Sequence, residues 1–191
     1  QVDAADEVVA SYLESSIDVA GSNGALPPGY LYQSDAAPES PAGVIIRSMQ
    51  LIDADGSPLK AVRTWQAAGF RIEFATTRAF RSFSAEMNIS TTDGVTLIRT
   101  STSPDHTIPL SVQPGRHRID CFFDQLPMAA GEYVVGASLA IPGTEYLTRN
   151  DSLCRLTVSP EDIFGSTMAP LSSRYFVATP HRWHAPMSIG P

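Results

Sequence analysis

The sequence predicts an all-β fold, an antiparallel sandwich or barrel of short strands that follows a short N-terminal helix. Between residues 44 and 158, apolar and polar residues alternate with a period of two in several separate runs. Turn-forming sequences, Asp53-Ala-Asp-Gly56 and Asp93-Gly94, separate some of these runs. Almost none of this region repeats its apolar residues with the helical period of 3.6, so helices are not expected there.

The composition is that of one globular domain. The chain has 191 residues, of which 43% are hydrophobic and 17% charged, enough apolar material for a core and too little charge for disorder. A net charge of −7 and a pI of about 4.9 give a surface that repels phosphate backbones, so no nucleic acid partner is expected. No apolar run approaches the roughly 20 residues of a membrane helix. The chain starts at Gln1 without a signal peptide, and we interpret it as a piece of a longer protein.

Residues 1–20 are predicted to form the helical end of an upstream linker. Asp3 can cap a helix there, and acidic residues follow in its first turn. The apolar residues of one helical face are Val8, Val9, Tyr12 and Leu13. Residues 21–43 contain four prolines among glycines and small residues, and they predict an arm that lies over the surface. Tyr30, Leu31 and Tyr32 are its candidate anchors.

Residues 44–191 are predicted to form the β-sandwich domain. The expected strands cover residues 44–51, 70–74, 83–90, 95–100, 118–123, 133–141 and 154–158, with a late extra strand at 174–178. Ser159 and Pro160 resemble a helix start, but the segment after them has room only for a short turn.

Several kinds of catalytic or metal site have no counterpart in the sequence. There is no Gly-x-x-x-x-Gly-Lys-Ser/Thr string, no Gly-x-Ser-x-Gly elbow and no His-Glu-x-x-His string, and no cofactor or metal is expected. His181 and His184 stand three residues apart without accompanying glutamates, which favours an exposed tail over a metal site. Cys121 and Cys154 lie in strand-like runs, which favours two buried thiols and leaves a single disulfide open.

The polar positions of the predicted strands suggest a carbohydrate-binding surface on one face. The candidate sugar contacts are Glu86, Asn88, Arg118, Asp120 and Ser138. Carboxylate, amide and guanidinium groups make the paired hydrogen bonds that sugar hydroxyls accept and donate, and aromatic rings stack on sugar faces. Two alternatives remain open: a glycan-active enzyme that uses Glu86 and Asp120 as its carboxylate pair, and a structural module whose polar face is simply solvated. Trp65 and Trp183 fit either the core or a ligand site.

The order of several segments resembles a known family, the C-terminal carbohydrate-binding domain of Wzt-type proteins. These proteins are the ATPase subunits of ABC transporters that export O-antigen polysaccharide. The matching segments are spread over most of the chain: Ala5 to Leu13, Ile45 to Gly56, Phe70 to Phe74, Leu126 to Tyr133, Leu156 to Gly165, and Trp183. No short motif of the family fixes its binding residues, so none is carried over by position.

The resemblance implies an immunoglobulin-like or jelly-roll sandwich that is not an enzyme. It also implies recognition of a modified non-reducing end of the O-antigen glycan before export. The family further implies a homodimer that can exchange C-terminal strands, and a cytoplasmic location at the inner membrane. Contact with the membrane subunit of the transporter would be made through an ATPase domain, which this chain lacks.

Overall fold

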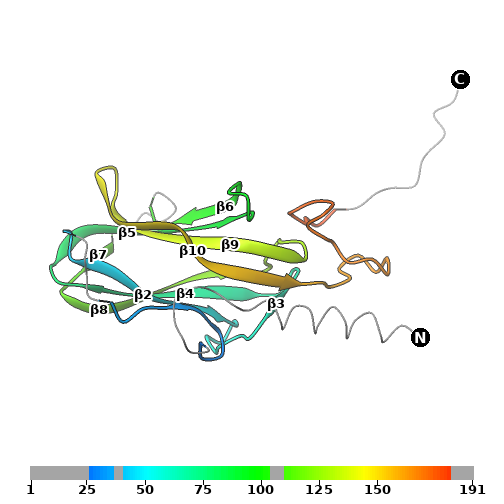
Figure 1. The fold of residues 1–191 in the computed structure, drawn as a ribbon, viewed down its shortest axis with the longest axis horizontal. Coiled ribbons are helices and arrows are strands. Elements are labelled where there is room, and N and C mark those ends of the chain that lie inside the picture. Colours follow the sequence, from blue (N-terminus) through cyan, green and yellow to red (C-terminus); the bar gives the residue numbers. More distant parts are fainter. Residues whose placement is uncertain (1–25, 37–40, 104–109, 182–191) are drawn as a thin grey trace, which may run out of the picture.

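The computed structural model describes residues 26–36, 41–103 and 110–181, and these form two facing β-sheets (Figure 1). The four-stranded sheet has the order β1-β2-β4-β8, and the six-stranded sheet has the order β3-β10-β9-β5-β6 with β7 paired to β5. The strands are β1 (Tyr30–Gln33), β2 (Val44–Ile52), β3 (Val62–Arg63), β4 (Ala68–Thr76), β5 (Phe80–Ser90), β6 (Thr96–Ser101), β7 (Leu110–Val112), β8 (Gly115–Phe123), β9 (Gly131–Ile141) and β10 (Glu145–Ser159). The predicted all-β fold is confirmed, and the helix expected at 1–20 lies outside the described residues.

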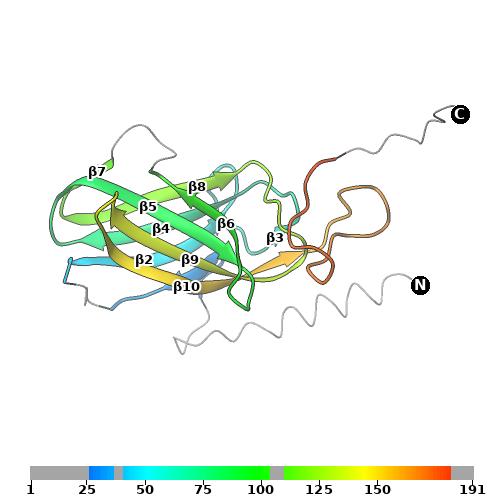
Figure 2. The same ribbon diagram turned by 90° about the horizontal axis from the view of Figure 1, so that it is seen from above.

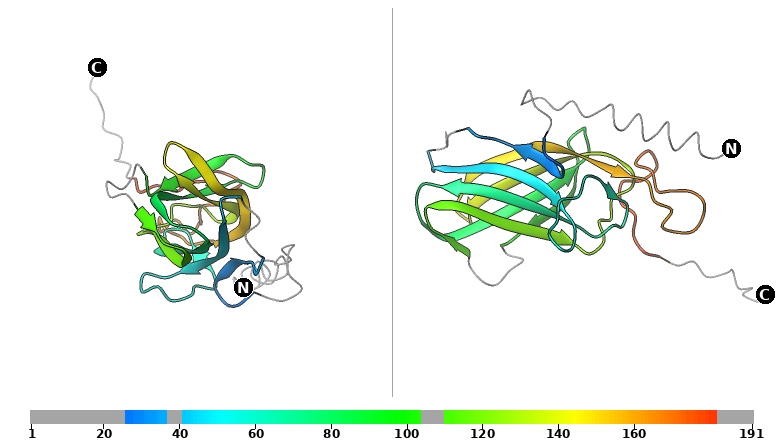
Figure 3. Two further views of the ribbon diagram at one scale, coloured as in Figure 1. Left: turned by 90° about the vertical axis from the view of Figure 1, so that its left-hand side faces the viewer. Right: turned by 90° about the horizontal axis from the view of Figure 1, so that it is seen from below.

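The two layers can be seen separately from opposite sides. Figure 2 looks onto β5, β9 and β10 of the six-stranded sheet, and the right panel of Figure 3 looks onto β1, β2, β4 and β8. Neighbouring strands are antiparallel except for β3, which runs parallel to the end of β10. The described residues contain no helix with the length and apolar character needed to cross a bilayer.

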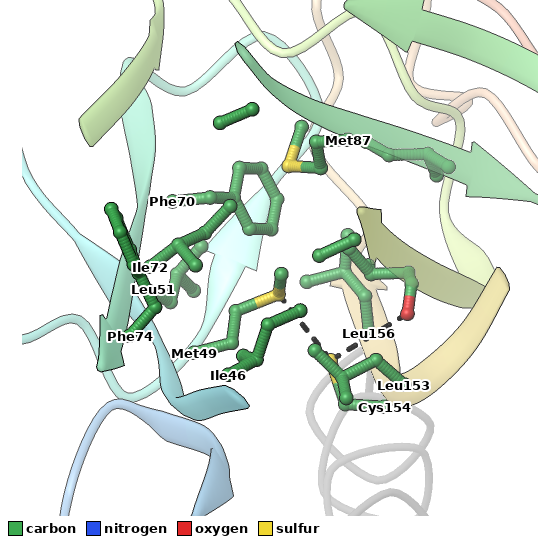
Figure 4. Packing of buried hydrophobic residues seen from close by; sticks show 14 of the residues in the cluster. Ile46, Met49, Leu51, Phe70, Ile72, Phe74, Met87, Leu153, Cys154 and Leu156 are labelled. Carbon is green, nitrogen blue, oxygen red and sulfur yellow. Dashed lines mark hydrogen bonds between the residues drawn. The ribbon is translucent and has the colours of Figure 1, made fainter. Parts of the chain in front are cut away.

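The core lies between the sheets and follows the alternation of the sequence. On β4, Phe70, Ile72 and Phe74 are each at most 2% exposed, whereas Arg71 and Glu73 point to the outer surface. Figure 4 shows side chains of both sheets meeting in this layer, with Met49 of β2 beside Cys154 of β10. Their sulfur atoms are 3.5 Å apart, so this contact joins the two sheets.

Part of the predicted arm is a strand. Tyr30–Gln33 pairs with β2 and forms the edge of the four-stranded sheet, because Tyr32 and Leu31 bury part of their surface against the core. The Asp53 turn is confirmed: its Oδ1 accepts hydrogen bonds from the backbone nitrogens of Asp55 and Ser57 at 3.0 and 2.8 Å. Gly56 has a φ of +81°, which an L side chain would strain.

The prediction of a late strand at residues 174–178 is wrong. This segment makes one isolated bridge, Val177 to Met128, and a second isolated bridge joins Leu171 just before it to Ala130, so no continuous ladder forms. Trp65 fastens it to the sandwich, because the indole nitrogen donates a hydrogen bond to the carbonyl of Ala178 at 2.8 Å. Side-chain anchoring and single bridges follow no period of two, so alternation alone overestimated the regularity of this segment.

Candidate functional site

The structure distributes the five predicted sugar contacts over two sheets. Glu86 and Asn88 of β5 and Ser138 of β9 belong to the six-stranded sheet, where Glu86 and Ser138 are directly paired. Arg118 and Asp120 of β8 belong to the four-stranded sheet. The expectation that all five share one face is therefore wrong. Alternation separates the inner from the outer face of a strand, but it does not tell which sheet the strand joins.

A pocket of about 210 Å³ lies on the outer face of the six-stranded sheet, and we call it the outer-face pocket. Its walls are the β5–β6 hairpin on one side and the irregular part of β10 on the other. Its lining residues are Asn88, Ser90, Thr91, Thr92, Gly94, Thr96, Arg99, Val134, Arg149, Asp151 and Ser152. The lining is rich in hydroxyl, amide, carboxylate and guanidinium groups, the groups that hydrogen-bond sugar hydroxyls.

A bulge in β10 forms one wall of this pocket. Asn150 pairs with Ala137 and Cys154 pairs with Val135, so β10 carries two more residues than β9 between these pairs. The extra length brings the carbonyl of Asp151 over the sheet, where the Asn88 amide donates to it at 3.4 Å. Gly136 makes this possible, since a Cβ atom there would lie 2.4 Å from Asn88 Oδ1 and 2.6 Å from Asp151 O.

An exposed tyrosine lies beside the outer-face pocket within a network of paired charges. Tyr146 is 43% exposed, and its hydroxyl group is 3.0 Å from Arg99 Nη2 and 3.3 Å from Glu86 Oε2. Arg99 also forms an ion pair with Glu86 at 2.7 Å, and this hydrogen bond raises the pKa of Arg99 above its ordinary value. The Arg149 guanidinium lies 4.9 Å from the centre of the Tyr146 ring and is held by both carboxylate oxygens of Asp151.

The outer face of the four-stranded sheet is also polar, but Arg71 and Asp120 on this face are paired with each other. Arg71 donates two hydrogen bonds to Asp120, at 3.0 and 2.9 Å, and these hydrogen bonds raise the pKa of Arg71. Arg71 also donates to the carbonyl of Gly56, which ties the β2–β3 loop to this face. Arg118 is exposed opposite Glu73, whose carboxylate accepts from Ser48.

Ser138 and Trp65, two candidate ligand residues from the sequence, are occupied mainly by contacts within the protein. Ser138 is 4% exposed, so it offers little surface to a ligand. Trp65, for which core and ligand positions were both open, packs edge-on against Phe164 and holds Ala178. Trp183 and His184 lie outside the described residues. Within the described ranges, no group of three or more His, Cys, Asp or Glu residues is placed to hold a metal ion.

Both cysteines are free, so the disulfide that was left open is not formed. Cys154 is buried, and burial raises the pKa of its thiol to about 12. Cys121 is half-buried and packs against the margin of the core.

The sequence analysis missed four residues around the outer-face pocket: Arg99, Tyr146, Arg149 and Asp151. Arg99 stands opposite Asn88 and was visible as a polar position of the predicted strand at 95–100. The other three precede the predicted strand at 154–158, in a polar run whose irregular pairing hides any alternation. Only a search for an aromatic residue among charged neighbours would have singled out Tyr146.

Comparisons with known proteins agree with this architecture. A crystal structure described as the C-terminal domain of Wzt superposes with a TM-score of 0.64 and 17% sequence identity, covering 83% of this chain and 92% of that one. At that identity the superposition shows the fold alone. No curated protein sequence gives a significant match. The family model of the Wzt C-terminal domain matches residues 41–169, well over half of the sequence, and the chain therefore belongs to the Wzt C-terminal domain family.

Proposed function

We propose that this chain is a non-catalytic carbohydrate-binding module that recognises the modified non-reducing end of an O-antigen polysaccharide. Membership of the Wzt C-terminal domain family supports a role in an O-antigen ABC transporter. Selection of the correct glycan end would then be coupled to export by that transporter.

The observation that carries the proposal is the outer-face pocket with the exposed Tyr146 beside it. The pocket is lined by hydroxyl and amide groups and two guanidinium groups, and the ring of Tyr146 lies beside it, next to the guanidinium of Arg149. Sugars are bound by such combinations, in which hydrogen bonds orient the hydroxyl groups and an aromatic face supports the ring carbons.

Of the five residues expected from the sequence, Asn88 and Glu86 fit this role best. Asn88 lines the outer-face pocket, and Glu86 holds Arg99 and Tyr146 in place. Ser138 would support Glu86 from the neighbouring strand. Arg118 and Asp120 would contact a longer glycan that reaches the opposite sheet.

Each hydrogen bond of this kind contributes about 0.5–1.5 kcal/mol, so one site is expected to bind weakly. A homodimer with two sites would raise the effective affinity for polymers that reach both. Light scattering over a range of concentrations tests the homodimer, and a monomer throughout would count against it. We propose a cytoplasmic location at the inner membrane for the transporter-bound protein.

Calorimetry with the export polysaccharide tests the binding proposal. We expect saturable heat with the intact polymer and none after removal of its non-reducing terminal unit. Arg99→Ala should weaken binding about tenfold or more, because a charged hydrogen-bond donor at the pocket is lost. Arg155→Ala is the matched control, since Arg155 is an exposed β10 arginine whose ion pair with Glu132 lies outside the outer-face pocket.

The same samples test the two alternatives. Release of new reducing ends from the polymer, abolished by Glu86→Ala or Asp120→Ala, would identify a glycan-active enzyme. Absence of saturable heat with either form of the polymer would favour a structural module and contradict carbohydrate binding.

A further inference from the structure

The C-terminal segment of the described chain carries a concentrated group of exposed apolar side chains, which we call the C-terminal surface. Its members are each between 37% and 52% exposed: Phe164, Met168, Leu171, Tyr175, Phe176 and Val177. Other large apolar side chains that the described residues expose, such as Val95 and Phe122, stand singly. A concentration of this kind on a globular domain is typical of an interaction surface.

The backbone of the C-terminal surface is held in place although its side chains are exposed. The backbone nitrogen of Ala129 donates to the carbonyl of Phe176 at 2.9 Å. Ala178 is bound twice, because its nitrogen donates to the carbonyl of Pro127 and its carbonyl accepts from the Trp65 indole, both at 2.8 Å. A surface that is ordered before its partner binds loses less conformational entropy on binding.

An arginine without an acidic partner lies within the C-terminal surface. Arg174 is exposed, and no described carboxylate lies within ion-pair distance of it. The two acids of the preceding turn are already engaged. Glu161 pairs with Arg63 at 2.8 Å. Asp162 accepts a hydrogen bond from the backbone nitrogen of Ser166 at 3.0 Å. The complement of this surface is therefore an apolar segment that also carries negative charge.

The N-terminal segment of the sequence has this character. Its residues 5–13 predict an amphipathic helix with Val8, Val9, Tyr12 and Leu13 on one face. Residues 1–25 lie outside the described part of the chain, and they contain five acidic residues and no lysine or arginine. Amphipathic helices dock by laying such an apolar face on an apolar surface.

The described chain begins at the end of the sandwich that carries the C-terminal surface. Soon after Leu26, the carbonyl of Gly29 accepts a hydrogen bond from Leu51, near the end of β2, at 2.7 Å. Strand β3 follows the next loop and pairs with the last residues of β10, from which the C-terminal segment continues. Figure 1 shows β3 and the C-terminal segment at the same end of the molecule.

The intervening chain is long enough to bring the two segments together. Residues 14–25 separate Leu13 from Leu26 and span up to about 40 Å when extended. The nine-residue strand β2 is about 30 Å long by comparison. A flexible tether of this length gives an effective concentration of about millimolar, so even a weak contact is occupied.

We propose that residues 5–13 dock as an amphipathic helix on the C-terminal surface of the same chain. The apolar face of that helix lies against the exposed side chains, and Arg174 faces the acidic residues of the segment. A second copy of the chain complements the surface less well. A two-fold contact would set Arg174 against the same surface of the partner subunit, whose described residues offer no free carboxylate there. This inference does not depend on carbohydrate binding.

Paramagnetic relaxation NMR on the full chain tests the docking. A spin label at Ser11→Cys lies outside the apolar face of the predicted helix. Cys121→Ser removes the more accessible native thiol, and Cys154 is buried. We expect the label to broaden the methyl signal of Met168 and the backbone signals of residues 174–177.

Val9→Glu and Ala10→Glu form a matched pair of variants. Each adds one carboxylate before the first strand, but only Val9 lies on the apolar face of the predicted helix. Val9→Glu should abolish the broadening, whereas Ala10→Glu should retain it. Arg174→Glu should weaken it, because the attraction to the acidic segment becomes a repulsion. Gly143, in the turn at the far end of β9, should stay unbroadened in every sample.

A mixed sample separates a contact within one chain from a contact between copies. Isotope-labelled chains without a spin label are mixed with spin-labelled chains that carry no isotope, and no broadening is expected there. Broadening that is present in the mixed sample, survives Val9→Glu, or is missing when one chain carries both labels would overturn the inference.

Discussion

Tyr133 is the largest side chain that the described core buries completely. Its hydroxyl group satisfies its hydrogen-bonding requirement by donating to the carbonyl of Ala129 at 2.8 Å. Burial raises the pKa of Tyr133 to about 12 from an ordinary value of 10.0, because the phenolate would lose its hydration inside the protein. The free energy of unfolding is therefore expected to fall at alkaline pH, where Tyr133 is ionised more readily in the unfolded chain than in the folded protein.

We predict that Tyr133→Phe changes the pH dependence of the free energy of unfolding. For an acid whose folded pKa is raised, the stabilisation is complete below the unfolded pKa and is lost as pH rises through the folded pKa. The Tyr133 contribution therefore declines between pH 10 and pH 12, by about 1.4 kcal/mol at pH 11. At pH 8 the variant should be less stable by about 1 kcal/mol, owing to the lost hydrogen bond.

Urea unfolding of both proteins at pH 8 and pH 11 measures this difference. The deficit of Tyr133→Phe should shrink or reverse at pH 11. Cys154 also titrates in this range, but it is present in both proteins and its contribution cancels in the comparison. An equal deficit at both pH values would contradict the role assigned to the phenol.

At the scale of elements, the bulge of β10 forms one wall of the outer-face pocket. The bulged backbone can pass close to β9 only because Gly136 has no side chain. We predict that Gly136→Ala destabilises the protein by about 2–3 kcal/mol and abolishes glycan binding. The new Cβ would meet the backbone of Asp151, which cannot move without displacing the bulge and the Arg149–Asp151 pair.

Gly69→Ala is the matched control for this prediction. A Cβ at Gly69 would meet the ring of Phe122 at 2.6 Å and Ile52 Cγ1 at 3.0 Å. The Phe122 ring is 49% exposed and can rotate aside, and the Ile52 side chain needs to shift by only a few tenths of an ångström. Gly69→Ala should therefore cost less stability and keep binding to the outer-face pocket. Thermal unfolding and calorimetry on the two variants measure both effects. Retained binding in Gly136→Ala would show that the bulge does not shape the site.

The elements also show what the sequence could and could not predict. Strand β4 was predicted correctly from the alternation of Phe70, Ile72 and Phe74 with polar residues. This alternation arises because one face of the strand is buried and the other faces solvent. Strands β3 and β7 have two and three residues, too few for any alternation. Of the residues at the outer-face pocket, the sequence predicted Asn88, which lies on a regular strand, but not Tyr146. Tyr146 reaches Glu86 only because strands that are distant in the sequence lie close together in the fold, and alternation within one strand cannot show this.

At the scale of the whole molecule, one core joins both sheets, and Cys154 reports on its integrity. Its sulfur lies beside Met49 of the opposite sheet, and the residue is 4% exposed (Figure 4). A reagent reaches this thiol only when β10 separates from β2. Cys121, in contrast, lies half-buried at the open edge between β6 and β8.

We therefore predict that Cys154 reacts with thiol reagents only through global unfolding. In a Cys121→Ser protein, which keeps Cys154 as its single thiol, the opening free energy from labelling rates should equal the free energy of unfolding in urea. Mass spectrometry after timed labelling in increasing urea gives both quantities on one sample. A labelling free energy several kcal/mol lower would mean that β10 detaches alone. The bulge wall of the outer-face pocket would then open independently of the core, and glycan binding would have to stabilise β10 against that opening.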